Sequence, residues 1–141
     1  MPMTKVYMRR GSTPEHRKAI SDSIHTSLVE VLGIPDDDKY HVFHELDPDN
    51  LISAPVAFGL ERRAEAIFIQ TYFGARPVEQ LRELYRALVA NLADRPGLES
   101  RDIYINVVES ASANWWADGR VLNPATGFDE RIDQDKLPTS S

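Results

Sequence analysis

The chain has 141 residues, 42% of them hydrophobic, a formal net charge of −6 at pH 7 and no cysteine. This suits one domain with a real core and excludes disulfides, thiol catalysis and thiolate metal sites. The acidic balance argues against a nucleic-acid or anionic-membrane binder, because both need a concentrated basic face. No apolar stretch approaches the roughly 20 residues that span a bilayer, and the first residues lack a signal peptide's apolar region. We therefore expect a soluble cytoplasmic protein.

The first half of the chain has the pattern strand, helix, strand. Residues 6–8 are a short β-prone run at the start,. Pro14 fits the first position of a helix, and apolar residues then recur at helical spacing. Gly33 stands where a left-handed C-terminal cap belongs,. A turn of three aspartates leads into a second predicted strand at residues 40–45.

The second half repeats this order after an irregular connection over residues 47–63, in which we expect a short strand near residues 56–60. A strong strand is predicted at residues 66–73,. Pro77 is expected to open a second amphipathic helix, and residues 103–108 are predicted to form another clear strand.

The two halves also match residue by residue. The matching positions are Gly11, Pro14, Gly33, Tyr40 and Glu45 in the first half and Gly74, Pro77, Gly97, Tyr104 and Glu109 in the second. A strand-helix-strand unit implies a parallel pair with a right-handed crossover. We therefore predict one α+β domain with a four-stranded mixed sheet and both helices on one face. The two repeats cover about residues 2–46 and 65–110, and an irregular tail covers about 111–141.

The other face of this sheet is expected to lack a cover. It would contain Val6, Met8, Phe43 and Phe68 or their neighbours, and nothing in the chain remains to pack on them. An uncovered apolar face predicts oligomerisation. A ferredoxin-like sandwich with an open face explains the same pattern equally well.

Pro2 is the most informative residue for chemistry. Removal of Met1, usual before a small second residue, leaves a secondary amine at the start of a strand. An α-amino group titrates near about 7.7–8.0, and burial or neighbouring cations lower that value. Such an amine serves as a general acid or base near neutral pH. The plainer alternative is a proline that only stiffens the terminus.

Arg76 and Asp38 are the other candidates for a site. Arg76 precedes Pro77 at the predicted helix start, where a guanidinium beside free backbone N–H groups forms a carboxylate site. Asp38 precedes the second strand, and the crossover topology brings it within reach of Pro2. The alternatives are a solvated arginine and a simple turn carboxylate.

The histidines do not predict a metal site. His41 and His44 point to opposite faces of one strand, and His16 and His25 lie on different sides of the first helix. We expect no metal. Of the adjacent Trp115 and Trp116, one is a candidate for the core and the other for the wall of a pocket or subunit interface, and core packing is the commoner explanation.

Several segments taken together match a known family: Pro2, Gly33–Tyr40, Arg76–Gln80, Val108–Ser110 and Asn114–Trp115. Through them the chain resembles the tautomerase superfamily, and within it the malonate semialdehyde decarboxylase-like proteins. The resemblance implies a homotrimer with an active site near each Pro2 at a subunit boundary, no cofactor, and a small carboxylate as substrate.

The resemblance also implies roles for individual residues. Pro2 would be the general acid or base, Asp38 would orient Pro2 or a water molecule, and Arg76 would bind the substrate carboxylate. Tyr40, Phe73 and Trp115 would form apolar walls of the pocket.

Two departures from the family pattern bear on the reaction. A family arginine falls on Gly74, and a family aromatic residue falls on Ala117. Arg9, Arg10, Arg62 and Arg63 are available to replace the missing arginine from another subunit. The departures favour keto–enol tautomerisation of a 2-oxo acid. Decarboxylase or hydratase activity is the alternative, as is a non-catalytic small-molecule binding or interaction protein of the same fold.

Overall fold

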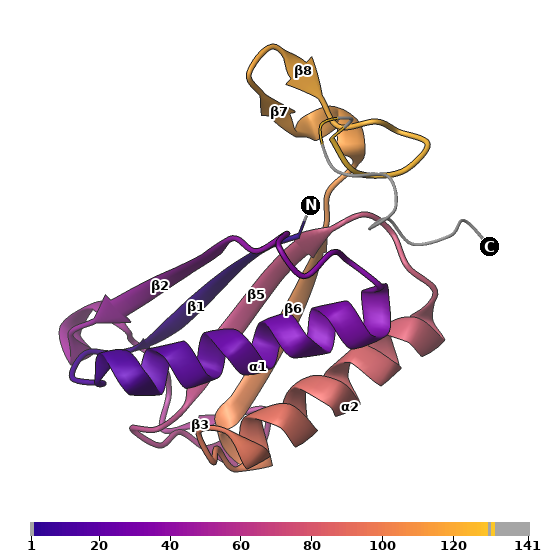
Figure 1. The fold of residues 1–141 in the computed structure, drawn as a ribbon. Helices are drawn as coiled ribbons and strands as arrows, with labels where there is room; N and C mark the ends of the chain where they lie inside the picture. Colours follow the sequence, from indigo (N-terminus) through magenta and orange to yellow (C-terminus); the bar gives the residue numbers. More distant parts are fainter. Residues whose placement is uncertain (1, 130, 132–141) are drawn as a thin grey trace.

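Two helices cover one face of a four-stranded sheet (Figure 1) in the computed structural model, which describes residues 2–129 and 131. The long elements are β1 (Met3–Arg9), α1 (Pro14–Leu32), β2 (His41–Leu46), β5 (Ile67–Phe73), α2 (Val78–Asp94) and β6 (Ile103–Glu109). The short strands are β3 (Val56–Ala57), β4 (Leu60–Glu61), β7 (Trp116–Ala117) and β8 (Arg120–Val121). This confirms the predicted α+β class. Within the described residues, no helix combines the length and apolar character needed to cross a membrane.

The strand order is β2-β1-β5-β6. β1 is parallel to β2, β5 is parallel to β6, and β1 runs antiparallel to β5 where the two repeats meet. In a ferredoxin-like unit another strand separates the two parallel strands of each repeat. Here they are direct neighbours, so the ferredoxin-like alternative is wrong.

Local sequence explains where α1 begins and ends. The Thr13 side chain accepts a hydrogen bond from the backbone N–H of His16, and Pro14 occupies the first helical position,. Gly33 ends the helix in the left-handed conformation (φ 68°), and its N–H donates to the Val29 carbonyl,.

The core lies between the sheet and the two helices. Its members are apolar and almost wholly buried: Val6, Met8, Ile20, Ile24, Leu28, Ile67, Ile69, Leu84, Leu88 and Leu92. Burial of one such side chain contributes about 1.5–3 kcal/mol. The helices are therefore held by the apolar stripes that the sequence shows.

The uncovered sheet face is formed by Phe68 and by neighbours of the other residues named from the sequence. Val6 and Met8 are buried beneath the helices, and Phe43 packs against the same core. Successive strand residues point to opposite faces, so their neighbours occupy the other face. There the ring of Tyr7 stacks on His44 at 4.7 Å and contacts Phe68 at 6.0 Å. Of the four residues named from the sequence, only Phe68 lies on this face.

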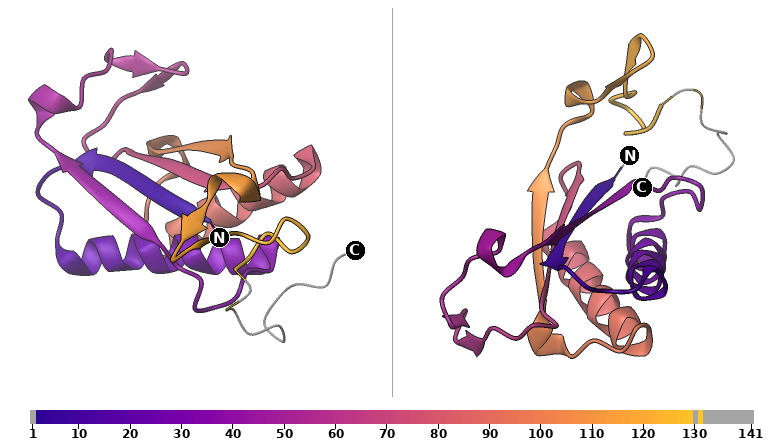
Figure 2. Two further views of the ribbon diagram at one scale, coloured as in Figure 1. Left: turned by 90° about the horizontal axis from the view of Figure 1, so that it is seen from above. Right: turned by 90° about the vertical axis from the view of Figure 1, so that its left-hand side faces the viewer.

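The connection before β5 contains a hairpin in place of the single strand expected near residues 56–60. β3 pairs antiparallel with β4 around Phe58 and Gly59, which both have positive φ,. Figure 2 shows this hairpin projecting on the side of the sheet opposite the helices. Phe58, at the tip of this hairpin, is 87% exposed.

The segment after β6 is more regular than predicted. β7 and β8 form a hairpin around Asp118 and Gly119, both with positive φ, and it extends beyond the end of the sheet where β1 starts (Figure 2). Leu122 and Phe128 are buried, Phe128 against the main core. The expectation of an irregular tail is wrong for residues 116–121, because two-residue strands leave no periodicity to detect. Residues 130 and 132–141 of that predicted tail lie outside the described residues.

Candidate active site

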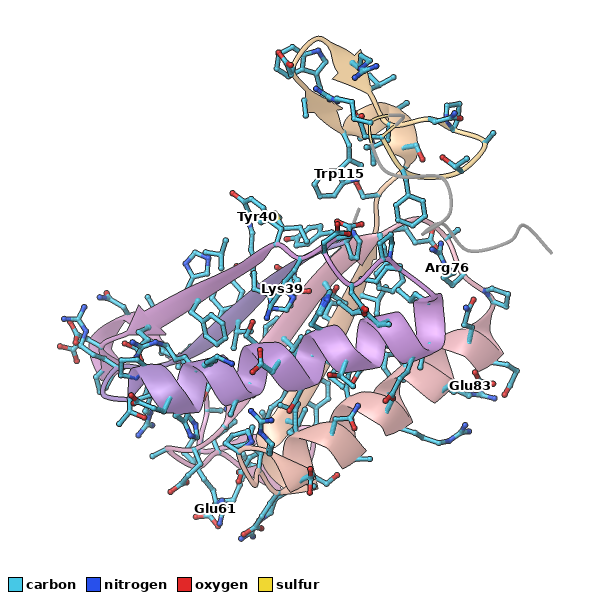
Figure 3. The ribbon with its side chains drawn as sticks, in the orientation of Figure 1. Lys39, Tyr40, Glu61, Arg76, Glu83 and Trp115 are labelled. Atoms are coloured by element: carbon cyan, nitrogen blue, oxygen red, sulfur yellow. The ribbon has the colours of Figure 1, made fainter. Side chains whose placement is uncertain are left out.

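A cavity of about 280 Å³ lies at the end of the sheet where β1 begins and β5 and β6 end. Its walls come from residues far apart in sequence, among them Pro2, Ile34, Phe73, Arg76, Trp115 and Phe128. Figure 3 shows Arg76, in the loop between β5 and α2, and Trp115, in the segment after β6, at this same end of the sheet. The two repeats thus meet at one cavity.

Strand pairing sets Pro2 in its place. Met3 is the register partner of Tyr72 in the antiparallel β1–β5 pair, so Pro2 lies beside Phe73 at the end of β5. Pro2 is buried and lines the cavity. The proximity of Pro2 to the loop that carries Arg76 follows from this register.

Asp38 is a buried carboxylate in the turn that precedes β2. It is 5% exposed, and neither carboxylate oxygen has a hydrogen-bond partner among the described residues. The Thr4 N–H donates to the Tyr40 carbonyl at 3.0 Å, which ties the chain just after Asp38 to the chain just after Pro2. Burial raises the pKa of Asp38, and the positive charge of the amino terminus opposes this shift,.

Asp38 does not line the cavity itself. Any influence of Asp38 on a molecule in the cavity would therefore pass through Pro2 or through a water molecule. An unpaired buried carboxylate is costly, so this position favours a donor that completes the site.

Arg76 lies one residue before the cap of α2, which is Pro77. The helix was predicted to begin at Pro77. It begins one residue later, because Pro77 has an extended backbone and takes the cap position. The guanidinium donates to the carbonyls of Gly74 and Ala75 at 3.0 and 3.1 Å and lies over the Phe73 ring at 5.6 Å. These contacts fix it at the cavity wall.

No carboxylate among the described residues forms an ion pair with Arg76. Burial lowers the pKa of its guanidinium, which stays charged because an arginine does not lose its proton in proteins. A half-buried cation without an anionic partner favours the binding of a small carboxylate. A Cβ at Gly74 would meet the Arg76 guanidinium at 3.5 Å, an ordinary van der Waals contact, so Gly74 lies directly beside that guanidinium.

The four arginines considered as substitutes do not line this cavity. Arg10 pairs with Asp47 at 3.3 Å, and Arg63 pairs with the buried Asp102. The Arg62 guanidinium lies over the ring of Tyr104 on the uncovered face. Within one chain, Arg76 is thus the arginine of the cavity among the described residues.

The apolar walls agree only in part with the prediction. Phe73 is buried and Trp115 is half-buried, and both line the cavity. Tyr40 lies outside it with 54% of its surface exposed.

Sequence reasoning missed several wall residues: Ser110, Ser112, Leu122, Pro124, Ala125, Thr126, Gly127 and Phe128. The Asp118-Gly119 turn was the available signal for their position, because it reverses the chain and brings the following segment back over Pro2. The apolar Leu122 and Phe128 then anchor that segment.

The described residues hold no group of three histidine or acidic side chains suited to a metal ion. His41 hydrogen-bonds Ser21 on the helix side of the sheet, whereas His44 stacks on Tyr7 on the other side. Among the described residues, Arg76 is the charged side chain that lines the cavity, and Pro2 lines it as well.

Two models described as tautomerase enzyme match the chain, one over residues 38–116 and one over residues 2–61. A probable tautomerase of Bacillus subtilis, YrdN, is 26% identical over 115 residues, which is 82% of this chain and 89% of the relative.

Solved structures give a similar result. Malonate semialdehyde decarboxylase superposes with a TM-score of 0.76 at 24% identity, covering 84% of this chain and 91% of that one. A fused 4-OT trimer superposes with a TM-score of 0.69 at 15% identity, covering 84% and 94%.

Proposed function

The chain belongs to the tautomerase family, and from this premise we propose that it catalyses keto–enol tautomerisation of a small 2-oxo acid with Pro2 as the acid–base group. The observation that carries the proposal is that Pro2 and the unpaired Arg76 line the same small cavity. Proton transfer and carboxylate binding are the two functions that this reaction requires.

The proton passes through the Pro2 nitrogen. In the mature chain, which begins at Pro2 after removal of Met1, the neutral amine accepts the proton of the enol hydroxyl. The enol oxygen becomes the carbonyl, and the carbon–carbon double bond takes a proton back from the prolinium at carbon. The amine ends as it began, so no co-reactant is needed.

Arg76 and Asp38 have different parts in this step. Arg76 binds the substrate carboxylate and stabilises the negative charge that develops on the neighbouring oxygen. Asp38 orients the Pro2 amine or a water molecule, and its unpaired oxygens support this role because an N–H at Pro2 would supply a donor.

The substrate is small and carries one carboxylate. A cavity of about 280 Å³ is at the lower limit of ligand pockets, and Phe73 and Trp115 supply its apolar wall. One arginine at this wall holds one carboxylate. Decarboxylation and hydration of malonate semialdehyde are the second candidate, favoured by the structural likeness to malonate semialdehyde decarboxylase.

We propose that three copies of the chain assemble. The uncovered sheet face with Tyr7, His44 and Phe68 supports this, as do the exposed Phe58 and the likeness to a fused 4-OT trimer. Sedimentation equilibrium is expected to give three chain masses at micromolar concentration. A mass of one or two chains at all concentrations would contradict the assembly.

The proposed function is tested by measuring both the removal of Met1 and the catalytic activity. The intact mass of untagged protein expressed in bacteria is expected to be short of one methionine. That protein should convert enolised 2-oxo acids, followed by loss of enol absorbance, faster than it releases carbon dioxide from malonate semialdehyde. A protein that retains Met1 and is fully active, or a processed protein with neither activity, would refute the proposal.

A further inference from the structure

We propose that His25 positions Asp38 for the proton transfer described above: its ring holds the turn that carries Asp38, and its positive form favours the carboxylate form of Asp38. The proposal rests on the role of Asp38 in the proposed function. His25 belongs to α1, the element that follows β1, and it does not line the cavity. It therefore acts through Asp38 and not on a substrate.

The first contact is a hydrogen bond between His25 and the turn. The Nε2 atom of His25 lies 2.6 Å from the backbone carbonyl of Asp36. A carbonyl oxygen only accepts, so Nε2 carries a proton and donates it. The N–H of Asp38 closes the same turn on the Pro35 carbonyl at 3.0 Å. The ring of His25 therefore fastens to α1 the turn that delivers Asp38.

The second observation concerns atoms left without partners. With Nε2 protonated, Nδ1 is the atom that gains the second proton. Nδ1 is buried without a hydrogen-bond partner among the described residues, and both oxygens of Asp38 share this condition. A buried polar atom without a hydrogen-bond partner destabilises the folded state. A protonated His25 ring would supply a positive charge near the carboxylate of Asp38, whose oxygens have no hydrogen-bond partner among the described residues.

The direction of the electrostatic coupling agrees with this arrangement. Burial raises the pKa of Asp38, whereas the positive charges of the amino terminus and of His25 lower it. Loss of the His25 charge is therefore expected to favour the protonated form of Asp38, which no longer accepts a hydrogen bond with full strength.

Other titratable groups near His25 lie on α1, on the turn and on β2. On α1, Asp22 pairs with Lys18 and with Lys39 of the turn, at 2.6 and 3.2 Å. On the turn, the charge of Asp37 raises the pKa of Asp38, and Asp36 is exposed. On β2, the ring of His41 meets that of His25 edge-on at 6.3 Å.

His41 does not replace His25 in this role. Burial lowers the pKa of His41 to about 4, with smaller contributions from Lys39 and His25. His41 is thus neutral across the pH range in which a tautomerase is assayed.

Two substitutions separate the anchor from the charge. His25→Gln keeps an N–H donor for the Asp36 carbonyl and cannot ionise, whereas His25→Leu removes both. We expect His25→Gln to retain kcat on the high-pH plateau and to move the acidic limb of the kcat/KM profile to higher pH. We expect His25→Leu to lose in addition about ten- to a hundredfold of kcat, because a misplaced group costs rates of that order. His16→Gln, near the start of the same helix, is the matched control and should match the wild type.

A second measurement does not depend on activity. The titration of the Asp38 carboxyl carbon, followed by carbon-13 NMR, is expected to move to higher pH in His25→Gln and to stay unchanged in His16→Gln. An unchanged Asp38 titration together with an unchanged pH profile in His25→Gln would overturn the proposal. If the titration moves while removal of Pro2 leaves activity intact, the coupling stands and the proposed function fails.

Discussion

Replacement of Pro2 by alanine is expected to lower kcat/KM for an enolised 2-oxo acid by about 100-fold. Methionine is still removed before alanine, so a primary amine remains, but it rotates freely whereas the proline ring holds its nitrogen in one direction. The amine then spends little time aimed at the substrate. Steady-state kinetics at several pH values measure the effect.

A second variant makes this test sharper. One residue inserted before Pro2 moves the terminal amine by about 3.3 Å, the rise of one strand residue, and converts the Pro2 nitrogen to an amide that accepts no proton. Activity should fall further than in Pro2→Ala, toward the uncatalysed rate. Circular dichroism and sedimentation should match the wild type, because the core lies between the helices and the sheet. Full activity in the extended protein would remove the Pro2 amine from the mechanism.

Substitution of Arg76 by alanine is expected to lower kcat/KM by about 10²–10³-fold, because a buried charged hydrogen bond is worth about 2–5 kcal/mol when one partner is removed. The loss should appear in both KM and kcat, since the guanidinium binds the carboxylate and also stabilises charge in the transition state. Arg76→Lys should recover only part of it, because an ammonium does not form the bidentate contact.

An exposed arginine of α2 serves as the control for Arg76. Arg82 is exposed and pairs with Glu79 at 2.6 Å, so Arg82→Ala should leave the kinetics unchanged. An ester of the substrate, which lacks the carboxylate charge, should react at similar rates with the wild type and Arg76→Ala. Equal losses for the acid and the ester would mean that Arg76 supports the fold and does not bind the carboxylate.

Much of the fold could be predicted because the decisive signals are local. Pro14 and Gly33 mark the ends of α1 through the backbone angles that each residue favours,. The recurrence of these signals in the second half predicts two strand-helix-strand units, and a parallel crossover then limits the topology to few choices. Pro2, Asp38 and Arg76 were candidates for the same reason, since each stands at the end of an element that the sequence delimits.

The sequence by itself therefore determined the duplicated architecture, both helices and the residues able to carry acid–base chemistry. Only the tertiary structure decided which alternating set of each strand faces the helices, because a period of two residues is the same for either face. It also decided that Tyr40 is exposed while residues 122–128 close the cavity. The unpaired burial of Asp38 and its link to His25 depend on desolvation and on neighbours from another element. No local pattern encodes these, since both arise from contacts between segments distant in the chain.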